Sequence, residues 1–266
     1  MNLLFRTNLF KCSVIFVFIL RTHSVLAIGF DIRSEINKVA NDGYSGSVKF
    51  TTENKWGNTL SSAYWVQAVA RYRSGRHTTI GVLKVDNEQE GTEAFSGNSL
   101  AQLLYRYNVN DFYDLETNLT DYRDEFRGFS KRLSAAVGPR FRMIVTKKTE
   151  FFLGLGLMYE SQQLLPENRY PGQSEYDNST RIVVSESFSH EFSENMSFTT
   201  SMIFQINLEE FADIRFVPTV GIKIPLNKYF SYFVQANYIY ESEPPYDVVK
   251  YDLTLRQGLY LTYEVD

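Results

Sequence analysis

The side chains that could perform acid–base or nucleophilic chemistry are few, and most of them surround one histidine. His190 has Ser187 and Ser189 on one side and Glu186 and Glu191 close by. A serine, a histidine and a carboxylate acting together could hydrolyse an ester. Neighbours in one strand point to opposite faces, however, so they seldom reach the mutual hydrogen-bond geometry that a triad needs. We therefore expect no catalytic residue.

Sites for metals and cofactors are not indicated either. No cluster of Cys or His has the spacing of a zinc site. The acidic segments 86–93 and 121–125 could hold calcium weakly, but nothing in them indicates rigid ligand geometry, and solvated loops are the expected interpretation. Gly154 and Gly156 lie in a predicted strand with no helix after it, which argues against a phosphate loop. We expect no cofactor and no metal.

The charges that follow a pattern lie on one face of predicted strands. Between residues 248 and 263, Leu253 and Leu255 fall on one face, and Thr254 and Arg256 fall on the other. An apolar face about ten residues long is what a tilted strand needs to cross a bilayer. Charges on the polar face should point into a lumen, because in lipid each would cost about 2 to 4 kcal/mol near the midplane. The predicted lumen charges are Arg140, Arg142, Glu160, Lys223 and Arg256. Both signs occur, so we expect them to pair.

The same alternation recurs along most of the chain and predicts about twelve strands. The predicted segments are 45–54, 59–73, 77–88, 94–107, 112–123, 133–146, 150–163, 180–192, 196–208, 214–225, 229–240 and 248–263. Short turns alternate with longer links, as in an outer-membrane barrel, whereas a soluble sandwich has no reason to alternate so regularly. Pro218 falls on an apolar face and predicts a bulge or a register break. We expect an all-β fold, a transmembrane antiparallel up-and-down β-barrel, with both termini on the periplasmic side.

The first 27 residues read as a secretory signal peptide. Arg6 and Lys11 precede an apolar run from Cys12 to Leu20, which is too short for a spanning helix, and a small-residue exit ends at Ala27. The predicted organisation is a signal peptide at 1–27, a periplasmic lead-in at 28–44 and a barrel at 45–266. Of 27 basic residues three lie in the leader, so 24 remain against 31 acidic ones, a net charge of −7. That balance argues against a nucleic-acid partner.

Three groups of residues resemble a known family. Ser45 to Val48 followed by Gly57-Asn58-Thr59 is similar to the first hairpin of the domain of unknown function 481 family, the salt-induced outer-membrane protein type. Residues in the middle and at the end of the chain resemble its other two signatures. The shared positions are Gly57, Asn58, Phe126, Gly128, Arg132, Gly138, Arg140, Pro244, Pro245, Asp252 and Gly258.

The resemblance implies a small outer-membrane barrel of Gram-negative bacteria with no settled activity. The shared residues would then be turn formers and register markers rather than reactive groups. Family members usually finish on an aromatic residue, whereas Glu264-Val265-Asp266 follow Tyr263 here. We expect outer-membrane lipid and the barrel-assembly machinery as partners. The expected role is structural or related to envelope stress; the alternatives are a narrow channel for a small solute, a lipid-modifying enzyme and a soluble periplasmic sandwich.

Overall fold

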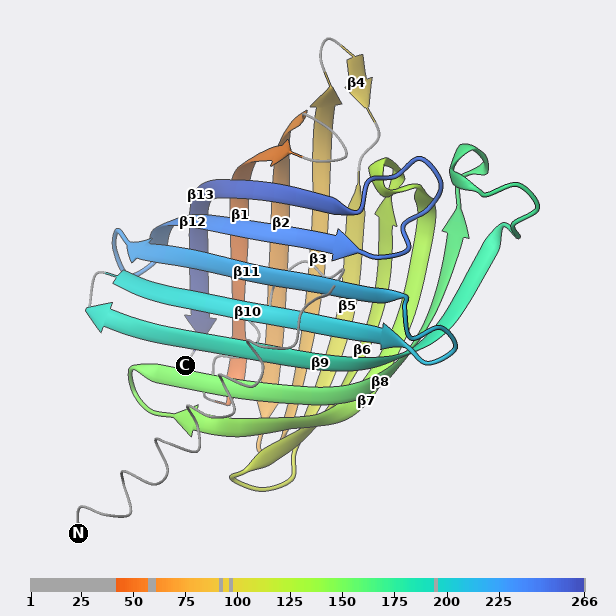
Figure 1. Cartoon of the computed structure of the whole chain (residues 1–266). Helices are drawn as coiled ribbons and strands as arrows, with labels where there is room; N and C mark the ends of the chain where they lie inside the picture. The colour runs from red at the N-terminus through yellow and green to blue at the C-terminus, as the bar shows by residue number, and fades with distance from the viewer. Residues whose placement is uncertain (1–41, 57–60, 91–92, 96–97, 194–195, 266) are drawn as a thin grey trace, which may run out of the picture.

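Twelve antiparallel strands form a closed ring in which the last strand returns to pair with the first (Figure 1). The computed structural model describes residues 42–56, 61–90, 93–95, 98–193 and 196–265. The strands of the ring are β1 (Gly43–Trp56), β2 (Ser61–Ser74), β3 (His77–Glu90), β5 (Ser99–Asn108), β6 (Tyr113–Asp124), β7 (Phe129–Val145), β8 (Thr149–Leu164), β9 (Tyr176–Ser193), β10 (Met196–Asn207), β11 (Ile214–Pro225), β12 (Phe230–Glu241) and β13 (Tyr251–Val265). This architecture confirms the predicted barrel.

The element boundaries differ from the predicted ones mainly at the long links. The predicted strand 94–107 is divided into the short β4 (Glu93–Phe95), which pairs with the end of β3, and β5. β7 and β9 each begin four residues earlier than predicted, and the links before them contain the 3-10 turns η1 (Glu125–Arg127) and η2 (Pro166–Asn168). β1 begins at Gly43, inside the segment that was predicted as a lead-in.

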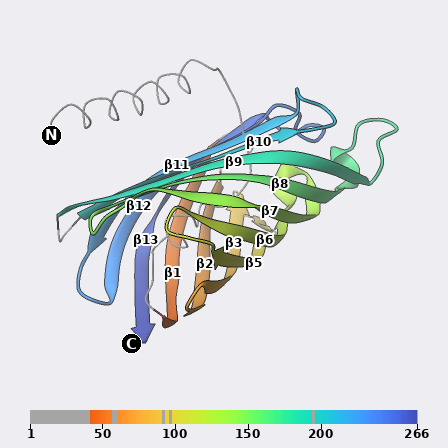
Figure 2. The same ribbon diagram turned by 90° about the horizontal axis from the view of Figure 1, so that it is seen from below.

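The two rims of the barrel carry different connections. The links 75–76, 109–112, 146–148 and 226–229 are on one rim, here called the short-turn rim. The links at 125–128, 165–175, 208–213 and 242–250 are on the other, the long-loop rim, where β4 also lies. In Figure 1 the long-loop rim lies at the upper right, and β9 to β12 cross in front of β1, β2, β3 and β5, as strands tilted to the barrel axis do. Figure 2 shows β13 beside β1 at the C-terminal end.

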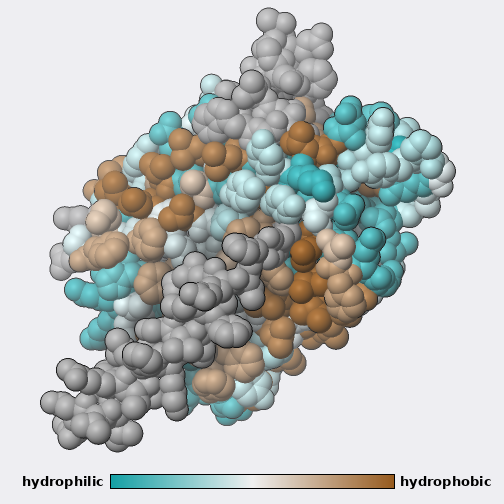
Figure 3. Space-filling model, in the orientation of Figure 1, coloured by the Kyte–Doolittle hydropathy of each residue, from teal (hydrophilic) through white to brown (hydrophobic). Residues whose placement is uncertain are grey.

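Side chains alternate between the lumen and the outside along the strands. In β13, Leu253 and Leu255 are exposed on the outer wall, whereas Thr254 and Arg256 are buried inside. Apolar side chains therefore collect on the outer wall, and Figure 3 shows them as brown areas between more hydrophilic regions. Within the described residues, no helix is long and apolar enough to cross a membrane.

The bulge predicted at Pro218 is absent. Pro218 pairs with Met202 of β10 without any shift in register. On the other side, the ladder with β12 lacks bridges at Val217 and Pro218 but resumes in the same register at Thr219. A proline has no N–H to donate, and here the sheet accommodates it by leaving out ladder bonds rather than by inserting a residue.

Candidate functional site

The long-loop end of the lumen holds a buried network of cations and carboxylates, here called the outer cluster. It consists of Arg127, Arg132, Glu160, Arg181, Asp213, Arg215, Glu241 and Asp252, each at most 8% exposed. Four guanidinium groups meet four carboxylates, so the formal charges cancel. Such pairing is required because an isolated charge is very costly to bury.

Two glutamates join the outer cluster together. Glu160 of β8 accepts a hydrogen bond from Arg215 of β11 and lies 3.6 Å from Nε of Arg181. Glu241 at the end of β12 lies 3.3 Å from Nε of Arg215 and 3.5 Å from Nη2 of Arg132. Breaking a buried pair costs about 3 to 5 kcal/mol, so these strands are held at fixed positions around the lumen.

Arg127 extends the ion pairs of the outer cluster across the barrel. It lies in η1 and donates from Nη2 to Glu241 at 3.0 Å and from Nη1 to Asp252 at 2.9 Å. η1 leads directly into β7, and β7 and β13 are six places apart in a ring of twelve, which is the opposite side. Burial alone would lower the pKa of the Arg127 guanidinium, but the carboxylates of Glu241 and Asp252 outweigh burial and raise that pKa. Arg127 is therefore a charged bridge across the long-loop end of the lumen. The predicted orientation of the barrel places this end outside the cell.

Three long loops pack together around the point where Arg127 turns inward. Gly128 ends η1 in the left-handed conformation (φ 77°), and a Cβ at this position would lie 2.8 Å from Cβ of Asn168 and 3.0 Å from Cβ of Pro245. The backbone N–H groups of Leu165 and Tyr246 donate to the carbonyls of Gly128 and Asn168, both at 3.0 Å. Only glycine fits this junction, so the loop that carries Arg127 is fixed against its neighbours.

The middle of the lumen is also occupied by side chains. Arg256 of β13 donates to Glu53 of β1 at 2.5 Å, and the indole N–H of Trp65 donates to the same carboxylate at 2.8 Å. The Lys84 ammonium lies 5.0 Å from the Trp65 ring. Beside this group, inward-facing apolar residues of β2, β3, β5, β6 and β7 form a cluster of their own. They are Val69, Ile80, Val82, Leu100, Leu104, Tyr122 and Phe129.

A second ionic group lines the wall of β5 to β7 toward the short-turn rim. Arg140 donates to Asp114 at 2.7 Å, Arg142 pairs with the same carboxylate, and Arg106 pairs with Glu116 at 2.7 Å. The cations and carboxylates of this group are thus paired, as a low-dielectric interior requires.

A cavity of about 190 Å³ opens at the short-turn end of the lumen, between β9 and β1. Its lining includes Lys49, Glu191, Lys223, Gln235 and Tyr260, all of which lie on the inward faces of their strands. The Lys223 ammonium lies 4.1 Å from the centre of the Tyr260 ring, and that of Lys49 lies 5.4 Å from it. This cavity is referred to below as the inner pocket.

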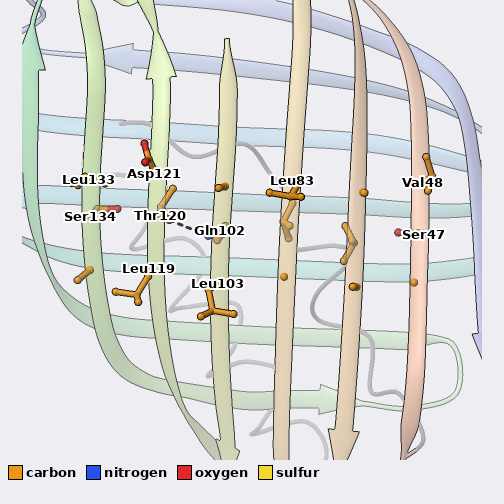
Figure 4. Close-up of a pocket in the computed structure, with 18 of the residues that line it drawn as sticks. Ser47, Val48, Leu83, Gln102, Leu103, Leu119, Thr120, Asp121, Leu133 and Ser134 are labelled. Atoms are coloured by element: carbon orange, nitrogen blue, oxygen red, sulfur yellow. Dashed lines mark hydrogen bonds between the residues drawn. The ribbon is translucent and has the colours of Figure 1, made fainter. Parts of the chain in front are cut away.

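A different depression, of about 940 Å³, lies on the outer wall over β1 to β8 (Figure 4). Leu83, Leu103, Leu119 and Leu133 surround it and are 45–62% exposed. Its floor consists of the small outward residues Gly46, Ala68, Ala70, Gly81, Ala101 and Ala135. Because its side chains face outward and are mainly apolar, this depression belongs to the surface that meets lipid.

Most of the predicted charged residues lie in the lumen. Arg140, Glu160, Arg256, Arg132 and Asp252 are buried in the lumen and take part in the ion pairs described above, or in the outer cluster. Two more predicted lumen charges are less buried, and one family-motif residue lies in a turn. Arg142 is partly buried beside Asp114, Lys223 lines the inner pocket, and Phe126 lies in η1.

The remaining predicted residues are structural. Gly138 and Gly258 lie where strand backbones approach closely, since a Cβ would come within 2.0 Å of the Leu155 carbonyl oxygen and 2.1 Å of the Phe50 carbonyl oxygen. Pro244 and Pro245 are buried in the loop between β12 and β13. Gly57 and Asn58 lie outside the described residues.

His190 lies on the opposite face of β9 from the buried Ser187. Its Nδ1 is 2.8 Å from the Thr149 hydroxyl, and its ring lies between those of Phe188 and Phe192 near the short-turn rim. Among the described residues, no group of three or more His, Cys, Asp or Glu side chains is arranged to hold a metal ion.

Several residues of the outer cluster were missed by sequence reasoning. Arg181 and Arg215 lie on the polar face of β9 and β11, so strand alternation could have identified them. Arg127 and Asp213 lie in links, where no alternation applies.

Comparisons with known proteins agree with this geometry. The family described as "Protein of unknown function, DUF481" matches residues 48–263. No curated protein matches the chain by sequence. Among solved structures, the NanC porin is similar with a TM-score of 0.56 and 8% identity, covering 80% of this chain and 98% of that one. The KdgM porin has a TM-score of 0.46 and 12% identity, covering 82% and 99%. The fold is that of outer-membrane porin barrels.

Proposed function

Given that this chain belongs to the DUF481 family of proteins of unknown function, we propose that it is a narrow outer-membrane channel for small solutes whose extracellular mouth is closed in this conformation. The observation that supports the proposal best is the Arg127 bridge to Glu241 and Asp252. An arginine from one loop crosses to the opposite wall, so η1 is one of the segments that close the mouth. Apart from the apolar cluster on β2 to β7, the lining of the lumen is charged and polar, which suits the passage of a solute.

A structural role connected with envelope stress is the second candidate. It is favoured by the ion pairs and the apolar cluster that fill the outer and middle lumen. Barrels of eight strands are filled in a similar way and enclose no channel, whereas barrels of sixteen strands carry water, so twelve strands are compatible with either function. Neither function requires catalysis, and we propose no enzymatic role for His190.

Conductance across planar lipid bilayers separates the two candidates. We expect the wild-type protein to show no conductance steps and Arg127→Ala to produce them, because the substitution removes the bridge. Arg123→Ala is the matched control, since Arg123 is an exposed arginine of the neighbouring strand β6. It should remain closed.

A second variant keeps the charge of the outer cluster balanced, so that loss of folding in the single variant does not decide the test. Arg127→Ala leaves buried carboxylates without their partner, whereas Arg127→Ala with Asp252→Asn removes one charge of each sign from the outer cluster. Heat-modifiable gel mobility reports that each protein is folded. Steady conductance of the wild type would contradict the closed mouth, and folded variants that stay silent would reject the channel in favour of the structural barrel.

A further inference from the structure

The depression on the outer wall over β1 to β8 is large enough to hold a ligand. Its volume of about 940 Å³ falls within the roughly 300 to 1,000 Å³ typical of ligand pockets. Glycine and alanine form its floor, and a Cβ at Gly81 would meet nothing within 4 Å. The surrounding side chains are Leu83, Leu103, Leu119 and Leu133 (Figure 4). Such a hollow can hold a flexible apolar chain against the barrel.

One end of this depression carries charged side chains that face outward. Asp121 of β6 belongs to the lining and lies on the long-loop side of Leu119 (Figure 4). Arg123 lies two residues beyond Asp121 on the same face of β6, about 7 Å along the strand. Lys131 occupies the equivalent place beside Leu133 on β7. Of the strand residues whose side chains the structure describes, these two are the cations on the outer wall.

The two cations differ in their contacts within the protein. Arg123 is exposed, and its side chain forms no hydrogen bond or ion pair with any residue that the structure describes. The Lys131 ammonium lies 3.6 Å from a carboxylate oxygen of Asp121, and the two side chains are 39% and 36% exposed. An exposed ion pair of this kind contributes little to stability. Arg123 is therefore the main group available to an anion, and Lys131 is shared with Asp121.

Both cations lie at the level at which lipid headgroups meet the barrel. Arg123 is the next-to-last residue of β6 and Lys131 is the third residue of β7, so both are close to the long-loop rim. The predicted orientation of the barrel places that rim on the outer side of the membrane. Hydrocarbon in the depression and a phosphate beside the cations would match the two parts of an anionic lipid.

From this arrangement we infer that the outer wall binds one phosphorylated lipid of the outer leaflet, with acyl chains in the depression and phosphate beside Arg123 and Lys131. A second copy of the chain fits this surface less well. A two-fold axis along the membrane normal would bring two equal hollows face to face and leave both unfilled. The site faces away from the lumen, so the inference does not depend on the proposed channel.

Native mass spectrometry of the full folded chain released from detergent micelles provides the test, because it counts bound lipids and detects dimers in the same spectrum. The probe is dimyristoyl phosphatidic acid. Dimyristoylglycerol keeps the acyl chains without the phosphate, and glycerol phosphate keeps the phosphate without the chains. We expect one bound phosphatidic acid, weaker binding of dimyristoylglycerol and no binding of glycerol phosphate.

Three substitutions test the headgroup end of the site. Arg123→Gln and Lys131→Gln should each weaken the binding of phosphatidic acid roughly fivefold, the scale of one basic residue beside an anionic lipid surface. Asp121→Asn should strengthen it, because the amide releases the Lys131 ammonium and no longer repels the phosphate. The control is Lys228→Gln, which removes a cation from the exposed turn at the other rim and should leave binding unchanged.

Two substitutions test the apolar part of the site. Gly81→Leu and Ala101→Leu should each weaken the binding of phosphatidic acid roughly tenfold, because the added side chain occupies space that the acyl chains need. The matched control is Ala236→Leu, which enlarges a small residue on the outer face of β12, outside the depression. It should bind as the wild type does. Heat-modifiable gel mobility reports that each variant is folded.

Three results would overturn the inference. The first is equal binding of phosphatidic acid and dimyristoylglycerol to the wild type. The second is unchanged binding in both folded glutamine variants, Arg123→Gln and Lys131→Gln, or in both folded leucine variants, Gly81→Leu and Ala101→Leu. The third is a dimer that Gly81→Leu abolishes, because the depression would then hold a second copy of the chain.

Discussion

Glu186 departs from the rule that carboxylates in the strands face the lumen. It lies on the outer wall of β9 between Val184 and Phe188, and its Cα partners are Leu153 of β8 and Met202 of β10. Its neighbours Ser185 and Ser187, not Glu186, are the buried residues of this stretch. A charge on the lipid-facing wall of a barrel is destabilising, with acidic residues costing less than basic ones.

Replacing this carboxylate should stabilise the barrel. We expect Glu186→Leu to raise the free energy of unfolding by up to about 2 kcal/mol, measured by urea denaturation in lipid vesicles. The matched control is Glu116→Leu, which removes a lumen glutamate that pairs with Arg106 at 2.7 Å and should be destabilising. A loss of stability in Glu186→Leu would show that Glu186 makes a favourable contact on the outer wall.

The strands close the ring through backbones that approach one another very tightly. Gly258 of β13 pairs with Thr51 of β1, and a Cβ at Gly258 would lie 2.1 Å from the Phe50 carbonyl oxygen. By contrast, a Cβ at Gly81 of β3 would meet nothing within 4 Å. The same residue type therefore has a strict steric role in one strand and none in another.

This difference gives a paired prediction. Gly258→Ala should destabilise the barrel by about 1 to 3 kcal/mol, because the new methyl group forces the closing ladder apart. Gly81→Ala should leave stability nearly unchanged. The measurement is the temperature at which heat-modifiable gel mobility is lost, and equal midpoints for the two variants would contradict the assigned role of Gly258.

At the level of whole elements, the sequence was sufficient to locate the strands but not their ends. Alternation is a property of residues inside a strand, so it identified β13 and the polar face that carries Arg256. It says nothing about links, and therefore η1, η2 and the division of 94–107 into β4 and β5 were not predicted. The bulge expected at Pro218 was wrong because the ladder can lose two bridges without changing register.

The whole molecule is a ring whose two ends differ. The long-loop end is crossed by the outer cluster, and the short-turn end opens into the inner pocket. Alternation predicted that Glu160 points inward, but its partner Arg215 lies three strands away, so only the closed ring reveals that they meet. Arg127 could not be assigned to the lumen from sequence, because a residue in a link has no strand face.

The closed mouth is tested most directly by labelling a thiol placed just beneath it. Thr254 lies two residues beyond Asp252 in β13, faces inward and is 2% exposed, and the chain's single cysteine, Cys12, lies in the predicted leader. In intact cells, a membrane-impermeant maleimide should not label Thr254→Cys while Arg127 is present. It should label Thr254→Cys once Arg127→Ala is added. As a control, it should label Glu243→Cys in the exposed loop both with Arg127 and with Arg127→Ala. Labelling of Thr254→Cys as fast as Glu243→Cys, with Arg127 in place, would contradict the account.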